Sequence, residues 1–327
     1  MTPISAIGKF LDQPILTAKI NKYIPLALAC GGVVVLGKTL KETPIENKKK
    51  EGSKVGIVLA STAISAIAAP KIASLCTGRK AAKTLTKIKE ENTNLVNRYI
   101  SKNYSDEMNH ILEKSKENLL SPKEISFLFN KNKELGNKLI PPPDNIKAKD
   151  IFKEIGWLSI YGAIPVAGGI TGGIAADKLC EHEWKTNVRD KVNEGIYQYL
   201  ANIFLCNIGA GAALGILEKM NIKSKAARCI GMIAGILATG VIGGSVIANY
   251  IGNKFINPIL FKDKETEKRT PELLDLSLHT DDIATVSLLS GLKWIEPSLP
   301  ILYSVSGYRA GIGYRNDKSS NKINIKS

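Results

Sequence analysis

Few side chains in this sequence stand at the spacings that catalysis or metal binding requires. The three histidines, His110, His182 and His279, all lie in polar stretches. The run Cys180-Glu181-His182-Glu183 places two soft metal ligands close together, but a zinc site needs a second ligand pair. The glycine clusters lack the Lys-Ser/Thr of a phosphate-binding loop. We therefore interpret the run at 180–183 as a solvated loop, and we expect no catalytic residue, cofactor or metal; the chain is not expected to be an enzyme.

The cysteines and the charge narrow the class of protein further. The chain has five cysteines, an odd number without a Cys-x-x-Cys pair, which argues against a disulfide framework. Its formal net charge is +15, yet the lysine-rich runs at 48–50 and 80–89 contain no aromatic residue that could stack on bases. This pattern favours contact with anionic lipid headgroups at membrane flanks over contact with nucleic acid.

Three long uncharged segments carry the main prediction for the fold. Ile155–Ala176, Gly195–Leu217 and Cys229–Asn253 contain 22, 23 and 25 residues. Each is as long as a transmembrane helix, and three such runs within about one hundred residues are difficult to bury in a soluble core. The sequence therefore predicts an all-α fold, a polytopic helical membrane bundle, with the bilayer as its main partner.

Up to three weaker segments accompany these. Tyr23–Gly37 has only 15 uncharged residues, about 22 Å of helix against a hydrocarbon core of about 30 Å. Val55–Gly78 has 24 residues but includes Pro70 and Lys71. Residues 283–305 are apolar but interrupted, which leaves open a broken sixth span, a re-entrant pair or an interfacial helix.

Polar stretches separate and flank these segments. Residues 1–22 form an expected amphipathic helix, either packed on the protein or lying at the membrane surface. Ser121-Pro122-Lys123-Glu124 is typical of a helix start, with a cap, a proline and a glutamate in order. The resulting division is 1–78, an amphipathic helix and weak membrane hairpin; 79–154, a basic helical polar insert; 155–253, a glycine-rich three-helix membrane core; 254–315, an amphipathic or re-entrant segment; and 316–327, a disordered tail.

Pairs of glycines four residues apart recur in all three strong segments. In lipid, close approach of helix backbones across small residues is a main source of helix association. This spacing predicts a tightly packed bundle, or a homo-oligomer, through the pairs Gly168 and Gly172, Gly169 and Gly173, Gly211 and Gly215, Gly231 and Gly235, and Gly240 and Gly244.

A few polar or kinking residues stand out against this apolar background. Pro165 is expected to kink its helix, and neutral side chains that can bridge helices include Asn202, Asn207 and Asn249. The strong segments contain no charge, which disfavours a proton-coupled carrier. In the tail, Lys293 and Glu296 are spaced for an ion pair on one helix face. Aromatic and basic residues surround this pair, and we interpret this part as interfacial. They are Trp294, Tyr303, Tyr308, Tyr314, Arg309 and Arg315.

These features favour one functional class and leave two alternatives. If five segments span, ten lysines and arginines flank each side, so the positive-inside rule assigns no orientation. The preferred hypothesis is a multi-pass membrane protein of structural or interaction type that presents its basic polar insert to a partner. The alternatives are a transporter or channel for a small solute, and a secreted protein that inserts into a foreign membrane.

Overall fold

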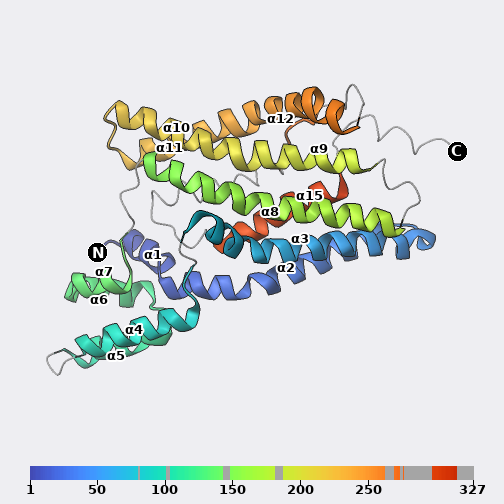
Figure 1. Ribbon diagram of the computed structural model, residues 1–327. Helices are drawn as coiled ribbons and strands as arrows, with labels where there is room; N and C mark the ends of the chain where they lie inside the picture. Colours follow the sequence, from blue (N-terminus) through green and yellow to red (C-terminus); the bar gives the residue numbers. More distant parts are fainter. Residues whose placement is uncertain are drawn as a thin grey trace. The chain divides into compact units, whose positions relative to one another are not determined.

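All regular structure in the described part of the chain is helical. The computed structural model (Figure 1) describes residues 1–79, 82–100, 104–142, 148–180, 187–261, 269–272, 275 and 297–314. This confirms the all-α prediction. Among the described residues, five helices are long and apolar enough to cross a membrane, namely Pro14–Glu42, Ile45–Thr77, Ile155–Cys180, Val188–Lys219 and Ala227–Phe261.

The helices group into two compact units, each assembled from separate stretches of the chain. Unit 1 combines Met1–Ile24, Lys80–Ile146 and Ala284–Leu299. Unit 2 combines Pro25–Arg79, Lys147–Ile283 and Pro300–Ser327. The five regions expected from the sequence are consecutive, whereas both units are discontinuous, because contacts between distant stretches define them.

Unit 1 is a cluster of short helices around its own apolar core. Its helices are α1 (Pro3–Leu11), the first turns of α2 (Pro14–Glu42), α4 (Leu85–Tyr99), α5 (Asp106–Glu117), α6 (Pro122–Lys131) and α7 (Lys133–Leu139). Buried apolar side chains from α4 to α7 form the core, among them Met108, Leu112, Leu128 and Leu135. Phe10 of α1 packs against this core, so of the two positions left open for the N-terminal helix, the contacts favour the packed one.

The predicted start of α6 is confirmed in detail. Ser121 caps the helix, and its hydroxyl accepts a hydrogen bond from the Glu124 backbone N–H. The Glu124 carboxylate accepts a bond from the Ser121 N–H in return, which completes a capping box. Leu135 lies on a separate short helix, because Asn132 ends α6 and caps α7. The polar insert predicted as helical is thus divided into four short helices, α4 to α7, within the described residues.

Unit 2 is built from long helices that extend beyond the apolar segments. Lysines at both ends of the 23–37 segment continue the helix, since lysine is a good helix former and its long side chain can reach a polar region. The 29 residues of α2 therefore measure about 43 Å rather than about 22 Å. The other elements are η1 (Ile45–Asn47), α3 (Lys48–Thr77), α8 (Ala148–Cys180), α9 (Val188–Tyr199), η2 (Leu200–Leu205), α10 (Cys206–Lys219), α11 (Lys225–Ile236), η3 (Leu237–Gly244), α12 (Ser245–Ile251), η4 (Gly252–Phe261) and α15 (Leu299–Ile312).

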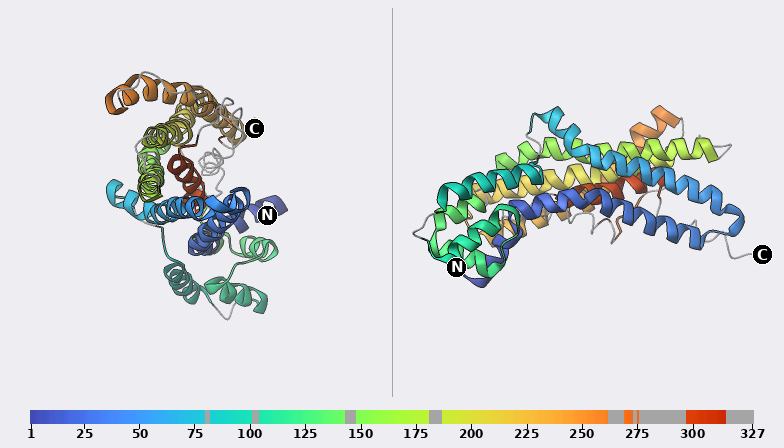
Figure 2. Two further views of the ribbon diagram at one scale, coloured as in Figure 1. Left: turned by 90° about the vertical axis from the view of Figure 1, so that its right-hand side faces the viewer. Right: turned by 90° about the horizontal axis from the view of Figure 1, so that it is seen from below.

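Among the described residues of unit 2, η2, η3 and η4 are π-helical. Without a break, η2 joins α9 to α10, η3 joins α11 to α12, and η4 extends α12. π-Helical turns are wider than α-helical turns and are often found near functional sites. Pro165 lies in α8, which runs continuously from Ala148 to Cys180 although proline cannot donate a backbone hydrogen bond. Within unit 2, α15 lies between α8 and α3 (Figure 2).

Candidate functional site: a buried ionic cluster

The predicted polar residues of unit 2 take different positions. Asn202 and Asn249 lie at a cluster of buried charges, and Asn207 lies one turn further along the same helix as Asn202. Pro165 faces α15, where its carbonyl oxygen lies beside Gly307. Lys293 and Glu296, the expected ion pair, lie outside the described residues.

One face of the α9–η2 helix supplies the first part of the cluster. Glu194, Gln198 and Asn202 follow one another at four-residue spacing, and all are at most 2% exposed. The Asn202 amide donates to Gln198 Oε1 at 2.8 Å, and the Gln198 amide donates to Glu194 Oε1 at 2.8 Å. The side chains form a ladder of hydrogen bonds that leads along the helix to the Glu194 carboxylate.

A short non-helical segment supplies the second part. The backbone of Arg269 is held by α12, because its N–H donates to Asn249 Oδ1 at 2.9 Å and its carbonyl accepts from Asn249 Nδ2 at 2.8 Å. The Arg269 guanidinium, which is 1% exposed, donates to Glu194 Oε2 at 3.2 Å and to Asp275 Oδ1 at 3.0 Å. Asn249 therefore positions the arginine that pairs with the two carboxylates.

Helix α15 supplies the third part. Its Arg309 guanidinium donates to Asp275 Oδ1 at 3.1 Å and to Glu272 Oε2 at 2.9 Å, and its Nε lies 3.8 Å from Glu194 Oε1. The sequence suggested an interfacial position for Arg309 and Tyr303, which stays a prediction; within unit 2 both side chains are buried against protein, at 3% and 2% exposure. The buried position of the Arg309 guanidinium is stable because carboxylates from two other segments neutralise its charge.

The end of α15 brings an aromatic ring over these charges. Gly313 has φ +65°, its N–H donates to the Ala310 carbonyl, and the Tyr314 N–H donates to the Arg309 carbonyl. This is the Schellman arrangement of a helix end. It directs Tyr314 back toward the cluster, where its ring centroid is 4.3 Å from the Arg309 guanidinium and its hydroxyl donates to Glu272 at 2.9 Å.

Arg269 is enclosed between two aromatic rings. Its guanidinium lies 4.5 Å from the ring of Tyr197 and 5.4 Å from the ring of Tyr314. Such cation–π contacts strengthen when water is excluded.

A second buried charge group lies one turn before Glu194 on α9. Lys191 Nζ donates to Asp177 Oδ2 at 2.6 Å, and Lys54 Nζ lies 3.6 Å from Asp177 Oδ1. These side chains connect α9, α8 and α3. The three strong apolar segments carry no charge, but charged residues just outside them, such as Asp177 and Lys191, are buried in the bundle.

The chemistry of the cluster is electrostatic pairing. The fully buried charges are two carboxylates, Glu194 and Asp275, and two guanidiniums, Arg269 and Arg309. Each carboxylate contacts both guanidiniums, so these four side chains carry no net formal charge. Among the described residues, no group of three or more His, Cys, Asp or Glu side chains has a geometry suited to a metal ion.

The predicted packing glycines make several backbone contacts. On α8, a Cβ at Gly168 or Gly172 would collide with the serines of α3, and one at Gly169 or Gly173 would overlap the carbonyl oxygens of α15. On α10, Gly211 faces the Phe152 ring, whereas Gly215 meets only Ala148 at an ordinary 3.7 Å. The remaining glycines lie in α11 and η3: Gly231 faces Leu217, Gly235 faces Gly209 and Ala213, Gly244 faces Ala201, and Gly240 is buried.

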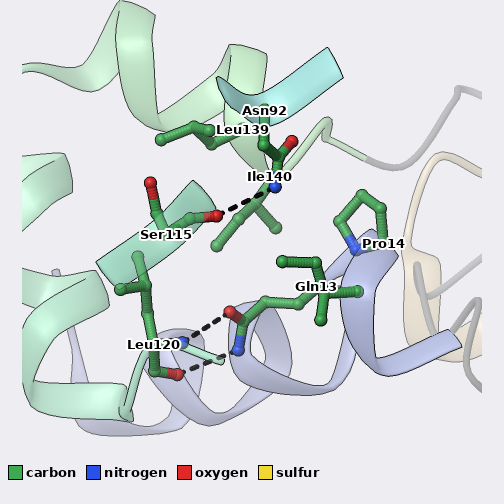
Figure 3. Close-up of a pocket in the computed structure, with 8 residues that line it drawn as sticks. Gln13, Pro14, Asn92, Ser115, Leu120, Leu139 and Ile140 are labelled. Atoms are coloured by element: carbon green, nitrogen blue, oxygen red, sulfur yellow. Dashed lines mark hydrogen bonds between the residues drawn. The ribbon is translucent and has the colours of Figure 1, made fainter. Parts of the chain in front are cut away.

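Unit 1 contains a small pocket of its own (Figure 3). Its volume of about 10 Å³ matches one water-sized sphere. The polar side chains around it are already paired: the Gln13 side chain exchanges hydrogen bonds with the Leu120 backbone, and Asn92 donates to the Ser115 carbonyl. We interpret this pocket as a packing feature of unit 1.

Comparison with known proteins provides no relative: no family model, curated protein or solved structure matches this chain.

Sequence reasoning missed the charged members of the cluster because it divided the chain at charged residues. The apolar segments were taken to end at Ala176 and to begin at Gly195, so Asp177 and Glu194 were counted as flanks. A signal was present in the polar periodicity of Lys191, Glu194, Gln198 and Asn202, which places these residues on one helix face. No comparable pattern indicated Arg269, Asp275 or Arg309, since tertiary contacts alone bring them there.

Proposed function

We propose that this chain is a multi-pass α-helical membrane protein of structural or interaction type. In this proposal the long helices of unit 2 form a bundle in the bilayer, and unit 1 is a helical module available to a partner. The observation that carries the proposal is the inverted polarity of unit 2. Its outward-facing side chains include Val34, Ile64 and Ile242, each about 70% exposed, while Glu194 and Arg269 are at most 1% exposed.

This distribution of exposed apolar and buried charged side chains is unfavourable in water and favourable in lipid. In water, exposed apolar helix faces lose the favourable burial that normally stabilises a fold. In lipid such faces need no cover, and ionisable groups turn to the bundle interior and pair with one another. The peripheral helix α2 fits this account best, since only 11% of its most apolar window is buried.

The connectivity of unit 1 supports an even number of crossings by α2 and α3. The chain leaves unit 1 within α2 and returns to it after α3, so that residues 1–24 and 80–146 belong to one compact unit. Both stretches must then lie on one side of a membrane. A hairpin of two spanning helices satisfies this requirement, and a single crossing would not.

The turn between α2 and α3 suits anionic lipid headgroups. Lys38 and Lys41 near the end of α2 and Lys49 near the start of α3 are exposed. Lysines at the ends of apolar helices can contact headgroups while their stems remain in apolar surroundings. We propose this turn as the part of unit 2 that meets the charged surface of the bilayer.

Alkaline carbonate extraction of membranes from expressing cells tests the proposal. We expect the protein to remain in the membrane pellet and to dissolve only when detergent is added. Release by carbonate would contradict it. A water-soluble pool that later becomes resistant to carbonate would instead favour insertion from solution into a foreign membrane.

A second candidate function, a channel or transporter for a small solute, is favoured by Asn207. This residue is 1% exposed, and its Oδ1 has no hydrogen-bond partner within the described part of the chain. An unpaired buried acceptor costs free energy, and a passing polar solute could satisfy it. Solute uptake into reconstituted vesicles that is lost in Asn207→Leu would favour transport over a purely structural role.

A further inference from the structure

Helix α15 is too short to cross a bilayer, yet it lies deep in unit 2. Its 14 residues measure about 21 Å, less than the hydrocarbon core of about 30 Å. Near its start, the Tyr303 ring packs edge-on against the Tyr161 ring of α8, with 5.2 Å between centroids. One turn later, Gly307 faces Pro165 and Thr62. The helix therefore begins inside the bundle.

The C-terminal end of α15 lies beside the start of α9. Gly313 lies against Asp190 and Lys191 at the start of α9. The Tyr314 hydroxyl donates to Glu272 at 2.9 Å, and Glu272 follows the candidate span Ala227–Phe261. Residues at both limits of the stretch from 272 to 314 thus meet at one end of the bundle.

Along part of its length, α15 packs directly against the backbone of α8. Gly307 and Gly311 lie against the backbone of α8 at Pro165 and Gly169. Small residues allow this close approach, but a backbone contact of this kind interlocks few side chains. The ion pairs of α15 are made by Arg309, which joins this helix to carboxylates of two other segments.

Glu194 forms ion pairs with both arginines of the cluster. It receives Arg269 from the non-helical segment at 3.2 Å and Arg309 from α15 at 3.8 Å, and it is fully buried. Removing one charge from a buried, balanced group leaves its partners uncompensated. A neutral side chain at position 194 would leave two guanidiniums facing the single fully buried carboxylate of Asp275.

We propose that Glu194, Arg269, Asp275 and Arg309 form an ionic lock that fastens α15 into the bundle, and that α15 leaves its position when this lock is broken while α8 to α12 remain packed. The lock connects the position of the C-terminal helix to a single carboxylate on α9. The lock does not depend on the proposed membrane function, since it can be measured in detergent.

Cysteine labelling of the full-length protein in detergent tests the lock. The reporter is Ser306→Cys, because Ser306 lies on α15 and is 2% exposed. Cys30, Cys76, Cys180 and Cys229 are replaced by alanine, and the fully buried Cys206 of α10 is kept as an internal standard for the packed bundle.

The expected result is selective exposure of α15. In Glu194→Gln, a water-soluble maleimide should label the cysteine at 306 at least about tenfold faster than in the reporter background, because a broken buried ion pair favours opening by that order or more. Cys206 should stay protected. The matched control is Glu218→Gln, which removes the carboxylate of the Arg228 pair on α10 and should leave both rates unchanged.

Three results would overturn the proposal: an unchanged rate at 306 in Glu194→Gln, equal labelling of Cys206, or an equal increase in the Glu218→Gln control. If Glu194→Gln does not fold, Arg309→Lys serves in its place. Lysine keeps the positive charge but lacks the planar fork that bridges two carboxylates, so the rate at 306 should still rise above the control. An unchanged rate in that variant would also reject the lock.

Discussion

At the scale of single residues, the buried charges of the fold depend on the partners that surround them. Glu194 is tolerated without solvent because two guanidiniums and an amide contact its two oxygens. In unit 1, Glu124 plays a comparable local part: its carboxylate accepts hydrogen bonds from Lys114 and from the Ser121 backbone. Burial acts to raise the pKa of Glu124, but the bonds from Lys114 and Ser121 outweigh it and hold this pKa below its ordinary value.

We therefore expect the stability of the start of α6 to decrease in acid. A carboxyl with a lowered folded-state pKa adds stability above its unfolded pKa, about 4.3 for glutamate, and this stability is lost as pH falls through the folded-state pKa. At neutral pH, α6 should be better protected from hydrogen exchange in the wild type than in Glu124→Gln. The difference should disappear in acid.

Hydrogen exchange of the full chain, with both proteins compared at each pH, measures this effect because intrinsic exchange rates cancel. The matched control is Glu113→Gln, since Glu113 pairs only with the neighbouring Lys116 and is more than half exposed. A difference at α6 that is equally large in acid and at neutral pH would contradict the role of the Glu124 charge.

At the scale of elements, the bundle is held by close contact between helix backbones. Helix α8 presents Gly168 and Gly172 to α3, and the Ser61 hydroxyl of α3 donates to the Gly168 carbonyl at 2.6 Å. It presents Gly169 and Gly173 to α15. One helix thereby supports two neighbours, because glycines one residue apart point to different faces.

A methyl group at Gly169 should separate α8 from α15. In Gly169→Ala the added Cβ would overlap the Gly307 carbonyl, and both groups belong to backbone that cannot easily move. We expect destabilisation by about 1–3 kcal/mol, the usual range for overpacking. Thermal unfolding of the detergent-purified protein provides the measurement.

The matched control for this prediction is Gly31→Ala in α2. A Cβ at Gly31 has nothing within 4 Å, and alanine is the better helix former. Its melting temperature should stay the same or rise slightly. Equal melting temperatures for Gly169→Ala and Gly31→Ala would mean that the α8–α15 contact does not require glycine.

The sequence predicted the elements better than their contacts. Charge-free length indicated the apolar helices, and the order of residues from Ser121 to Glu124 indicated a helix start, because both signals are local. Gly307 and Gly311 show the same four-residue spacing as the predicted pairs, but they lie in an interrupted stretch that was interpreted as interfacial. The ionic cluster could not be predicted, since Arg269, Asp275 and Arg309 approach Glu194 only through tertiary packing.

At the scale of the whole molecule, our central claim is that the chain crosses a bilayer and begins with a hairpin. The turn at η1 and the helices of unit 1 should then lie on opposite sides. This follows because α2 carries the chain away from unit 1 and α3 carries it back. A protein that is merely attached to one membrane surface would instead expose the turn at η1 and unit 1 on the same side.

The most direct test is the sidedness of two single cysteines in sealed membrane vesicles. Glu46→Cys marks the turn at η1, and His110→Cys marks α5 of unit 1; both positions are exposed. The native exposed cysteines are replaced, and an impermeant maleimide is added before and after the vesicles are opened. We predict that one cysteine is labelled in intact vesicles and the other only after opening. Labelling of both cysteines in intact vesicles, or of neither, would contradict the α2–α3 hairpin as a pair of membrane spans.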